Sequence, residues 1–372
     1  MTPPRLPLSR QPLRLIHDRI ATGLITAGGI GVLLAILAIG VFLVWETLPL
    51  LTFGDALSLN TLSPLAWGTL KAALAAMLFA TPIALGAAMY SALFMSARLR
   101  GRIKPMLELM EAIPGVVVGF IAGLLLAPWV EQHLASTLLV LVWLPLSAGL
   151  AGMLWYVASA KVRQWLPLSW AGVWLMPWLA IMITLALWLA PLLEHAWFGG
   201  DLRRMFDQQY GLDYATRNAL IVGIAMGFAV IPSIYSLAED ALADVPANLM
   251  EGAQALGASR WQALWKVALP TAGPGVFSAV MIGAGRAVGE TMIVLMASGN
   301  TALFRASPFE GLRSLSASIA IELPEASPGG MTYHLLIFAA LALFLFTFLV
   351  NTLAEVVRQR LRQRYQRLGG NR

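Results

Sequence analysis

Long uninterrupted apolar stretches dominate this sequence and limit its fold more than any other feature. A helix needs about 20 mostly apolar residues to cross a bilayer. Eight stretches reach that length, at roughly 21–45, 65–95, 112–130, 134–158, 168–193, 215–238, 274–298 and 331–354. The 372 residues are 59% hydrophobic and 12% charged, whereas a soluble domain is about 45–50% apolar and about 25% charged. We therefore predict an all-helical polytopic membrane protein with about eight spans, and we exclude a soluble enzyme and a disordered chain.

The distribution of basic residues predicts the orientation. Placing the N-terminus inside puts 18 of the 25 Lys and Arg residues on the inner side and only four on the outer side. Because basic residues favour cytoplasmic loops, both termini are predicted to be cytoplasmic. The first stretch is longer than a signal-peptide core and has no convincing small-residue cleavage site, so we interpret it as a permanent anchor. The basic tail is interpreted as a lipid-facing stop, and no nucleic-acid binding is predicted.

Three kinds of site are not expected in this chain. The absence of cysteine excludes disulfides, thiolate zinc sites and iron–sulfur clusters. No pair of histidines has metal-ligand spacing, so no metal site is predicted. The sequence contains no Walker A pattern, so any ATP and magnesium that drive the protein must be bound by another chain.

The longest inner loop, residues 239–273, has a pattern of its own. Residues 251–257 read Glu-Gly-Ala-Gln-Ala-Leu-Gly. Small side chains such as Ala253 give a short helix a small apolar face, and Gly257 is suited to end that helix in a left-handed conformation. The loop is therefore either an amphipathic connector at the membrane surface or a compact helix that docks in a groove of a cytoplasmic partner.

A second segment of the same loop leads back to the membrane. Trp261 and Trp265 are four residues apart and form one apolar stripe on a helix. Pro270 lacks an N–H and is expected to stop this segment before the next span.

This spacing resembles the "EAA" loop of ATP-binding-cassette (ABC) importer permeases. That pattern is Glu-x-Ala, three residues, Gly, nine residues, an aliphatic residue, x, Leu-Pro, and Gly252 replaces its usual second-position Ala. The matching residues are Glu251, Ala253, Gly257, Leu269 and Pro270. The resemblance implies that residues 247–259 are a coupling helix that seats in the cleft of a cytoplasmic ATPase subunit.

Two charged residues lie inside the apolar stretch 274–298. Arg286 is its thirteenth residue, and Glu290 follows four residues later on the same helical face. A charge at the bilayer centre costs roughly 2.5–3.5 kcal/mol on insertion scales. One interpretation is a buried structural ion pair. The other is an anion path, because a guanidinium matches phosphate oxygens and Glu290 could hold Arg286 until an anion displaces it.

Two glycines flank these charges on a neighbouring face. Gly285 and Gly289 form a small-xxx-small pattern, which lets a second helix approach closely. This suits a pore at a subunit interface.

The same stretch resembles the Gly-Arg-Ala-x-Gly-Glu-Thr-Met segment of the phosphate-specific transport (Pst) permeases. The continuation Ser-Gly-Asn at 298–300 and residues 67–131 and 214–239 are also similar to that family, nearest to its PstC-type subunit. Sulfate and molybdate permeases typically have Phe after Gly-Glu. By this resemblance, the substrate-path residues are Arg286, Glu290, Thr291 and Asn300.

The resemblance also divides the chain and shows two departures. It implies a cytoplasmic tail at 1–20, an anchor with a short periplasmic loop at 21–60, and a basic tail at 355–372. The permease domain is 61–354, with the coupling loop at 239–270. The family core has six spans, so 132–213 is an extra membrane segment. Only residues 46–63 occupy the place of a large outer insertion.

The implied function is a permease subunit of an ABC importer for inorganic phosphate in the bacterial inner membrane. The implied partners are a PstB-like ATPase dimer, a second PstA-like permease and a PstS-like phosphate-binding protein. Two alternatives remain open: a permease for sulfate, molybdate or phosphonate, and a channel or secondary transporter that needs no ATPase.

Four other charged residues are interpreted as ordinary membrane-edge groups. Lys71 and Arg217 lie near the outer ends of their spans, where their side chains are expected to extend to the interface. Glu108 and Glu111 lie at the inner edge of the third span, where a solvated or helix-start role is expected.

Overall fold

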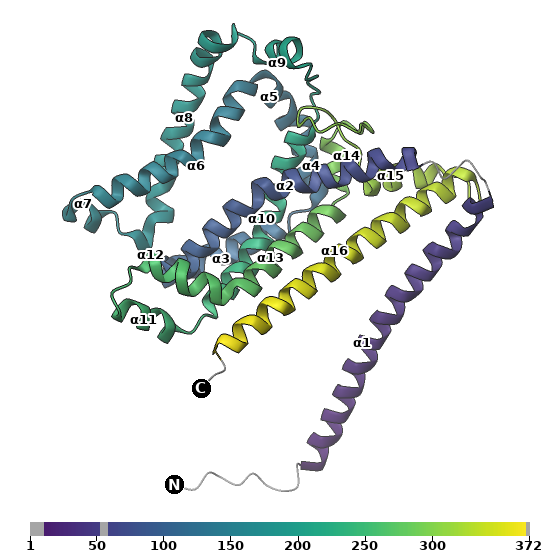
Figure 1. Ribbon diagram of the computed structural model, residues 1–372, viewed down its shortest axis with the longest axis horizontal. Helices are drawn as coiled ribbons and strands as arrows, with labels where there is room; N and C mark the ends of the chain where they lie inside the picture. The colour runs from purple at the N-terminus through teal and green to yellow at the C-terminus, as the bar shows by residue number, and fades with distance from the viewer. Residues whose placement is uncertain (1–10, 53–58, 370–372) are drawn as a thin grey trace. The chain divides into compact units, whose positions relative to one another are not determined.

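The computed structural model describes residues 11–52 and 59–369, and these are helical throughout their regular structure (Figure 1). Within them, eight helices are long and apolar enough to cross a membrane. The predicted all-helical class with about eight spans is confirmed. The parts of the 1–20 tail and the 21–60 region that fall at 1–10 and 53–58 lie outside the described residues, as does the end of the basic tail at 370–372.

The chain forms two compact units, and the first comprises residues 1–57 and 326–344. It contains α1 (Gln11–Thr47), the short helix η2 (Leu48–Thr52) and the beginning of α16 (Met331–Gly369). Nδ1 of His334 lies 2.9 Å from the carbonyl oxygen of Glu46. From Asp18 onward the side chains of α1 are mostly exposed, for example Ile25 at 76%, so this apolar helix has the surface of a lipid-embedded anchor.

The second unit comprises residues 58–325 and 345–372 and has a core of three helices. α10 (Ala219–Ala243) packs between α2 (Leu59–Leu93) and α13 (Leu269–Gly289). Glycines make this packing possible: a Cβ on Gly227 of α10 would lie 2.6 Å from the Phe79 ring of α2, and one on Gly283 of α13 would lie 2.4 Å from Ile234 of α10. Small residues at helix contacts allow close backbone approach within a membrane.

Short helices and one hairpin surround this core. The elements before α10 are α3 (Ala97–Glu111), α4 (Gly115–Ile121), the π-turn η3 (Ala122–Leu126), α5 (Ala127–Gln132), α6 (Leu134–Val157), α7 (Ala160–Trp165), η4 (Leu168–Trp170), α8 (Ala171–Phe198) and α9 (Leu202–Tyr210). Those after it are α11 (Ala247–Ala255), α12 (Arg260–Ala263), the π-turn η5 (Leu264–Ala268), α14 (Met292–Ala297), α15 (Leu315–Glu322) and η6 (Leu323–Glu325).

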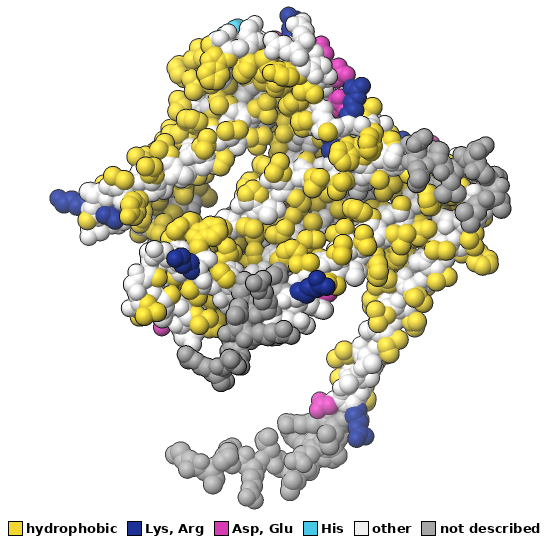
Figure 2. Space-filling model, viewed as in Figure 1, with side chains coloured by type: hydrophobic (Ala, Val, Ile, Leu, Met, Phe, Trp, Pro, Cys, Tyr) yellow, Lys and Arg dark blue, Asp and Glu magenta, His cyan; other side chains and the backbone are white. Residues whose placement is uncertain are grey.

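The segment predicted as extra, 132–213, folds as a hairpin of α6 and α8 followed by α9 (Figure 1). At one end of the hairpin, the Tyr90 hydroxyl of α2 donates to the Leu168 carbonyl and accepts from the Gly172 N–H. Many large apolar side chains of α6 and α8 are exposed, including Trp188 at 67%. Figure 2 shows hydrophobic side chains over the long helices of this unit and charged groups gathered near their ends, as a lipid-facing surface requires.

A glycine on α2 supports a prediction about this packing. A Cβ on Gly68 would lie 2.1 Å from the Arg313 carbonyl oxygen, so we expect Gly68→Ala to lower the free energy of unfolding by about 1–3 kcal/mol, as overpacking does. Gly86→Ala on the same helix is the control, because its Cβ meets nothing within 4 Å. Thermal unfolding of both purified variants in detergent measures the difference, and equal midpoints would contradict this account of the packing.

Candidate functional site

Arg286 occupies the meeting point of three helices. Its Nη1 lies 2.5 Å from Oε1 of Glu111, the last residue of α3, and donates to the Ser233 hydroxyl of α10 at 2.6 Å. The Ser233 hydroxyl in turn donates to the same Glu111 oxygen at 2.8 Å. The Arg286 and Glu111 side chains are 34% and 43% exposed. A charged, partly open triad therefore joins α3, α10 and α13.

The triad corrects two expectations about charged residues. Glu111, 175 positions away from Arg286 in the sequence, pairs with it in place of the expected partner Glu290. Glu111 is also not the ordinary solvated carboxylate that its place at the edge of a span indicated. Nothing in the local spacing could reveal this pair, because α3 and α13 are far apart in the sequence and are brought together by the packing of both against α10.

The helix that carries Arg286 is interrupted immediately after it. α13 ends at Gly289, Glu290 is extended with φ −69° and ψ 121°, and α14 begins at Met292. The predicted single span 274–298 is therefore two helices, and Arg286 lies in the last turn of α13. Its charge complements the partial negative charge of that helix terminus. In transport proteins, interrupted helices of this kind expose backbone groups at a substrate path.

Glu290 and Thr291 form the interruption itself. The Thr291 hydroxyl donates to the Gly289 carbonyl at 3.3 Å. A Cβ on Gly115, at the start of α4, would lie 2.8 Å from Oε1 of Glu290, so a larger residue at position 115 would make this carboxylate shift. Glu111 and Gly115 thus place the α3–α4 turn beside both Arg286 and Glu290.

Asn300 lies in a separate turn beyond α14. It has a left-handed backbone with φ 54°, and its N–H donates to the Ser298 hydroxyl at 3.2 Å. Its Oδ1 is buried without a protein partner. The structure therefore groups Arg286 with Glu111 and Ser233, and it places Asn300 in the loop that follows the interrupted helix.

The two predicted packing glycines differ in their surroundings. A Cβ on Gly285 would lie 3.2 Å from Oδ1 of Asn351 in α16, whereas one on Gly289 would meet nothing within 4 Å. Gly285 therefore contacts this chain's own α16, and Gly289 leaves open space at the end of α13.

The loop expected to carry a short helix does form one, α11. Glu251 is exposed and Ala253 is half-buried on this helix. Gly257 follows it with φ +89°, the left-handed conformation expected of a helix-ending glycine. The adjoining Leu256 side chain is 92% exposed, which leaves an unusually bare apolar group at the tip of the loop.

Pro270 does not end the helical segment that contains Trp261 and Trp265, contrary to the prediction. Helical structure runs from Arg260 to Gly289, and the N–H of Leu269 reaches back five residues to the Leu264 carbonyl through the π-turn η5. A π-turn therefore directly precedes the proline at which this helix was expected to end. The predicted Trp261–Trp265 stripe is present, with ring centroids 5.6 Å apart.

Comparison with known proteins shows what kind of protein combines these features. A family model described as the inner membrane component of binding-protein-dependent transport systems matches residues 80–363, more than half of the chain. The chain belongs to this family.

Similar individual proteins carry related names. The probable ABC transporter permease protein YqgH of Bacillus subtilis is 35% identical over 146 residues, which are 39% of this chain and 47% of the relative. The phosphate transport system permease protein PstC of Pasteurella multocida is 36% identical over 142 residues, 38% of this chain and 44% of that protein. This chain therefore matches less than half the length of each of these two relatives. PstC 1 of Mycobacterium bovis is 26% identical over 297 residues, 78% of this chain and 70% of the relative.

The Lys71 side chain does not extend to the interface as predicted. Its side chain is 8% exposed, and its Nζ is buried without a hydrogen-bond partner. Arg217 is also turned inward, because its Nε donates to the Gly123 carbonyl at 3.3 Å. Both side chains therefore turn toward the interior of the unit, and hydropathy alone could not distinguish that from a position at the lipid interface.

An ionic cluster closes the other end of α3. Fully buried Glu239 of α10 pairs with Arg100 and with Nζ of Lys104, the latter at 2.9 Å, and Lys104 also pairs with Asp240. Burial opposes the positive charge, but hydrogen bonds to Asp240 and Glu239 outweigh it and raise the pKa of Lys104. Together with the Arg286 triad, this cluster attaches α3 to α10 at two places.

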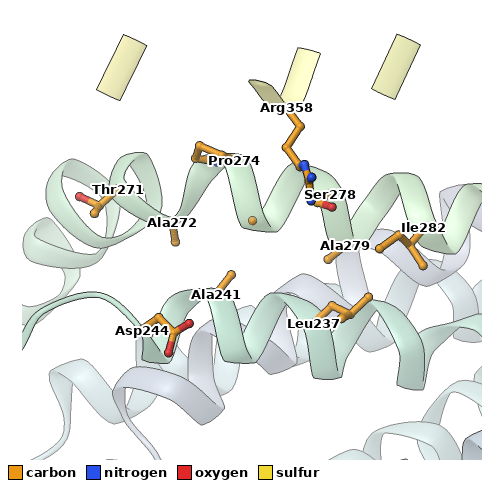
Figure 3. Close-up of a pocket in the computed structure, with 11 residues that line it drawn as sticks. Leu237, Ala241, Asp244, Thr271, Ala272, Pro274, Ser278, Ala279, Ile282 and Arg358 are labelled. Carbon is orange, nitrogen blue, oxygen red and sulfur yellow. The ribbon is translucent and has the colours of Figure 1, made fainter. Parts of the chain in front are cut away.

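A groove of about 450 Å³ lies between the C-terminal end of α10 and the N-terminal part of α13 (Figure 3). Its floor is made of small residues such as Ala241 and Gly275, and Arg358 reaches from α16 toward Ser278. Arg286 does not line it. The groove is therefore separate from the triad and adjoins the side on which α11 lies.

Proposed function

We propose that this chain is a membrane-spanning permease subunit of an ATP-driven importer of inorganic phosphate. The observation that carries the proposal is Arg286, held by Glu111 and Ser233 beside the Glu290–Thr291 helix interruption. Membership of the binding-protein-dependent transport family supports the transport function, and the names of the PstC relatives support the substrate.

The arrangement suits passage of an oxyanion rather than tight binding. Phosphate would accept hydrogen bonds from the planar guanidinium of Arg286, and Glu111 would then release that guanidinium. Glu111 keeps the resting guanidinium paired, so the anion meets a site whose positive field is partly neutralised. The protein makes or breaks no bond in phosphate. Glu290, Thr291 and Asn300 are proposed to continue the path along the interrupted helix and its following loop.

The proposed assembly places both termini in the cytoplasm of a bacterial cell, with the chain in the inner membrane. α11 would seat in the cleft of an ATPase dimer that binds ATP and magnesium. Glu251, Gly257, Leu269 and Pro270 would shape that coupling loop. One chain presents one such helix, so a second permease is expected, and an external phosphate-binding protein would deliver the substrate.

Uptake of radiolabelled phosphate at limiting concentration tests the proposal. Cells would express this chain with its neighbouring transporter genes, and excess sulfate or molybdate would serve as competitors. We expect uptake that needs ATP hydrolysis and ignores both competitors. Label displaced by sulfate or molybdate would overturn the substrate, and uptake that persists without the ATPase would overturn the importer mechanism.

Glu111→Gln is expected to loosen the resting state of the transporter. The substitution removes the negative charge from the hydrogen bond between Glu111 of α3 and Arg286 of α13. A hydrogen bond to a charged group contributes about 1.5–3 kcal/mol. ATP hydrolysis by the assembled complex without binding protein should rise at least about threefold, since roughly 0.7 kcal/mol of the pair's strength suffices for that. Glu108→Gln is the matched control, because Glu108 forms no ion pair among the described residues. Equal basal hydrolysis in both variants would argue against a latch.

A further inference from the structure

The helix α9 builds a polar surface at one end of the second unit. Its neighbours are the end of α5 and the residues leading into α10, and together they line a hollow of about 360 Å³. We call this the α9 surface, and its charged members are Glu131, Asp201, Arg203, Arg204, Asp207 and Asp213. α9 precedes α10 and α11 follows it, so this surface and the coupling loop lie at opposite ends of α10.

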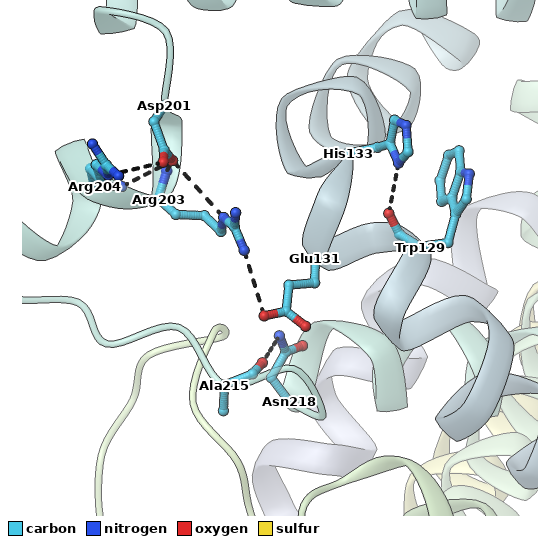
Figure 4. A network of polar contacts seen from close by, with 8 residues as sticks. All are labelled: Trp129, Glu131, His133, Asp201, Arg203, Arg204, Ala215 and Asn218. Atoms are coloured by element: carbon cyan, nitrogen blue, oxygen red, sulfur yellow. Dashed lines mark hydrogen bonds and ion pairs between the residues drawn. The ribbon is translucent and has the colours of Figure 1, made fainter.

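The α9 surface is fixed in place by its own contacts (Figure 4). Oδ1 of Asp201 caps α9 by accepting from the N–H groups of Arg203 and Arg204 at 3.1 and 3.3 Å. Nη1 of Arg203 reaches Oε1 of Glu131 at 3.5 Å and so joins α9 to α5. Leu202 is 4% exposed. A partner would therefore meet a preformed surface.

The α9 surface also connects to the loop that follows the interrupted helix. The Phe206 ring of α9 stacks on Phe309 with centroids 5.1 Å apart. The Phe309 carbonyl accepts from the Ala215 N–H at 2.9 Å, and the Glu310 carbonyl accepts from the Ala219 N–H at 3.1 Å. These contacts connect α9, through Phe309 and Glu310, to both the start of α10 and the loop after α14.

The charges at this surface are of both signs, and some of them are well exposed. Arg204 is 81% exposed, and Asp213 and Arg305 are 75% and 61% exposed and lie 3.8 Å apart. The six charged members of the surface comprise four carboxylates and two arginines. Such a surface repels anionic lipid headgroups, which favour basic clusters. It suits a soluble protein with complementary charges, because such patches guide association.

We propose that the α9 surface is where the soluble, external binding protein of this transporter docks. The inference rests on the proposed function, which places α9 on the outer side, and on a family whose description names a binding protein. Docking there would shift Phe206 and the Phe309 ring stacked on it, and so change the conformation of the loop that follows α14 beside the proposed substrate path.

The absence of cysteine from the chain allows a direct test. Arg204→Cys and Asp213→Cys each introduce a single thiol, and Arg163→Cys on α7, at the other end of the hairpin, is the control. The complete transporter in lipid nanodiscs would be mixed with the phosphate-binding protein from the same organism and a short bifunctional thiol–amine crosslinker. We expect crosslinks to the binding protein from positions 204 and 213 and none from 163.

A second readout separates this inference from the proposed function. The double variant Arg204→Glu/Asp213→Lys should raise, at least about tenfold, the concentration of binding protein that half-maximally stimulates ATP hydrolysis, and leave unstimulated hydrolysis unchanged. Stimulation equal to that of the unaltered chain, with no crosslink at 204 or 213, would overturn the α9 surface as the docking site. An unaltered transporter that no binding protein stimulates would overturn the proposed function itself.

Discussion

Arg286→Ala is expected to reduce phosphate uptake roughly 10- to 150-fold, since a hydrogen bond to a charged group contributes about 1.5–3 kcal/mol. The loss has two physical causes. The path loses its donor fork for the anion, and the Glu111 carboxylate is left without its cation, so that its negative charge repels phosphate. Uptake at limiting phosphate, normalised to the amount of protein in the membrane, measures the effect.

Two further variants distinguish the anion path from a structural ion pair. Arg286→Lys keeps the charge but loses the planar fork, so it should retain part of the uptake. Arg163→Ala removes an exposed arginine of α7, far along the chain from the triad, and should transport normally. Wild-type uptake by Arg286→Ala at equal membrane levels would reduce Arg286 to a structural charge.

The second large effect is expected at the tip of the coupling loop. The Leu256 side chain is 92% exposed in the chain alone, and burying a leucine against a partner contributes about 1.5–3 kcal/mol. Leu256→Asp should therefore lower transport-coupled ATP hydrolysis at least about tenfold. The fold of the chain itself should not change, because Leu256 packs against little of it.

The matching measurement is ATPase binding together with hydrolysis. A pull-down of the ATPase by the variant permease should weaken in parallel with stimulated hydrolysis, while Val162→Asp on α7, also at the predicted inner side, should leave both intact. Full coupling in Leu256→Asp would show that α11 does not insert this side chain into the ATPase.

Local features of the chain were predictable because their causes are local. The eight spans follow from apolar length, which any helix must have to cross a bilayer. The end of α11 follows from Gly257, since glycine adopts the left-handed φ of +89° without a Cβ penalty. Arg286 was identifiable as a candidate because a charge in an apolar stretch is costly wherever its partner lies.

The interruption at Glu290 and the continuation through Pro270 were not predictable in this way. The apolar stretch 274–298 predicts one continuous helix, whereas Glu290 is extended and α4 approaches its carboxylate at Gly115. Pro270 normally ends a helix, and here the π-turn at Leu264–Ala268 accompanies its continuation. Both outcomes depend on neighbouring geometry that residue type does not encode.

The sequence by itself therefore determined the helical class, the spans, the short helix of the long loop and the identity of the central cation. Only the tertiary structure decided which groups that cation meets. Glu111 and Ser233 reach Arg286 because α3 and α13 both pack on α10, and the burial of Lys71 on α2 appears only in the folded chain. The physical reason is the range of the forces: hydropathy and backbone preference act within a few residues, whereas ion pairs and burial depend on which distant helices come into contact.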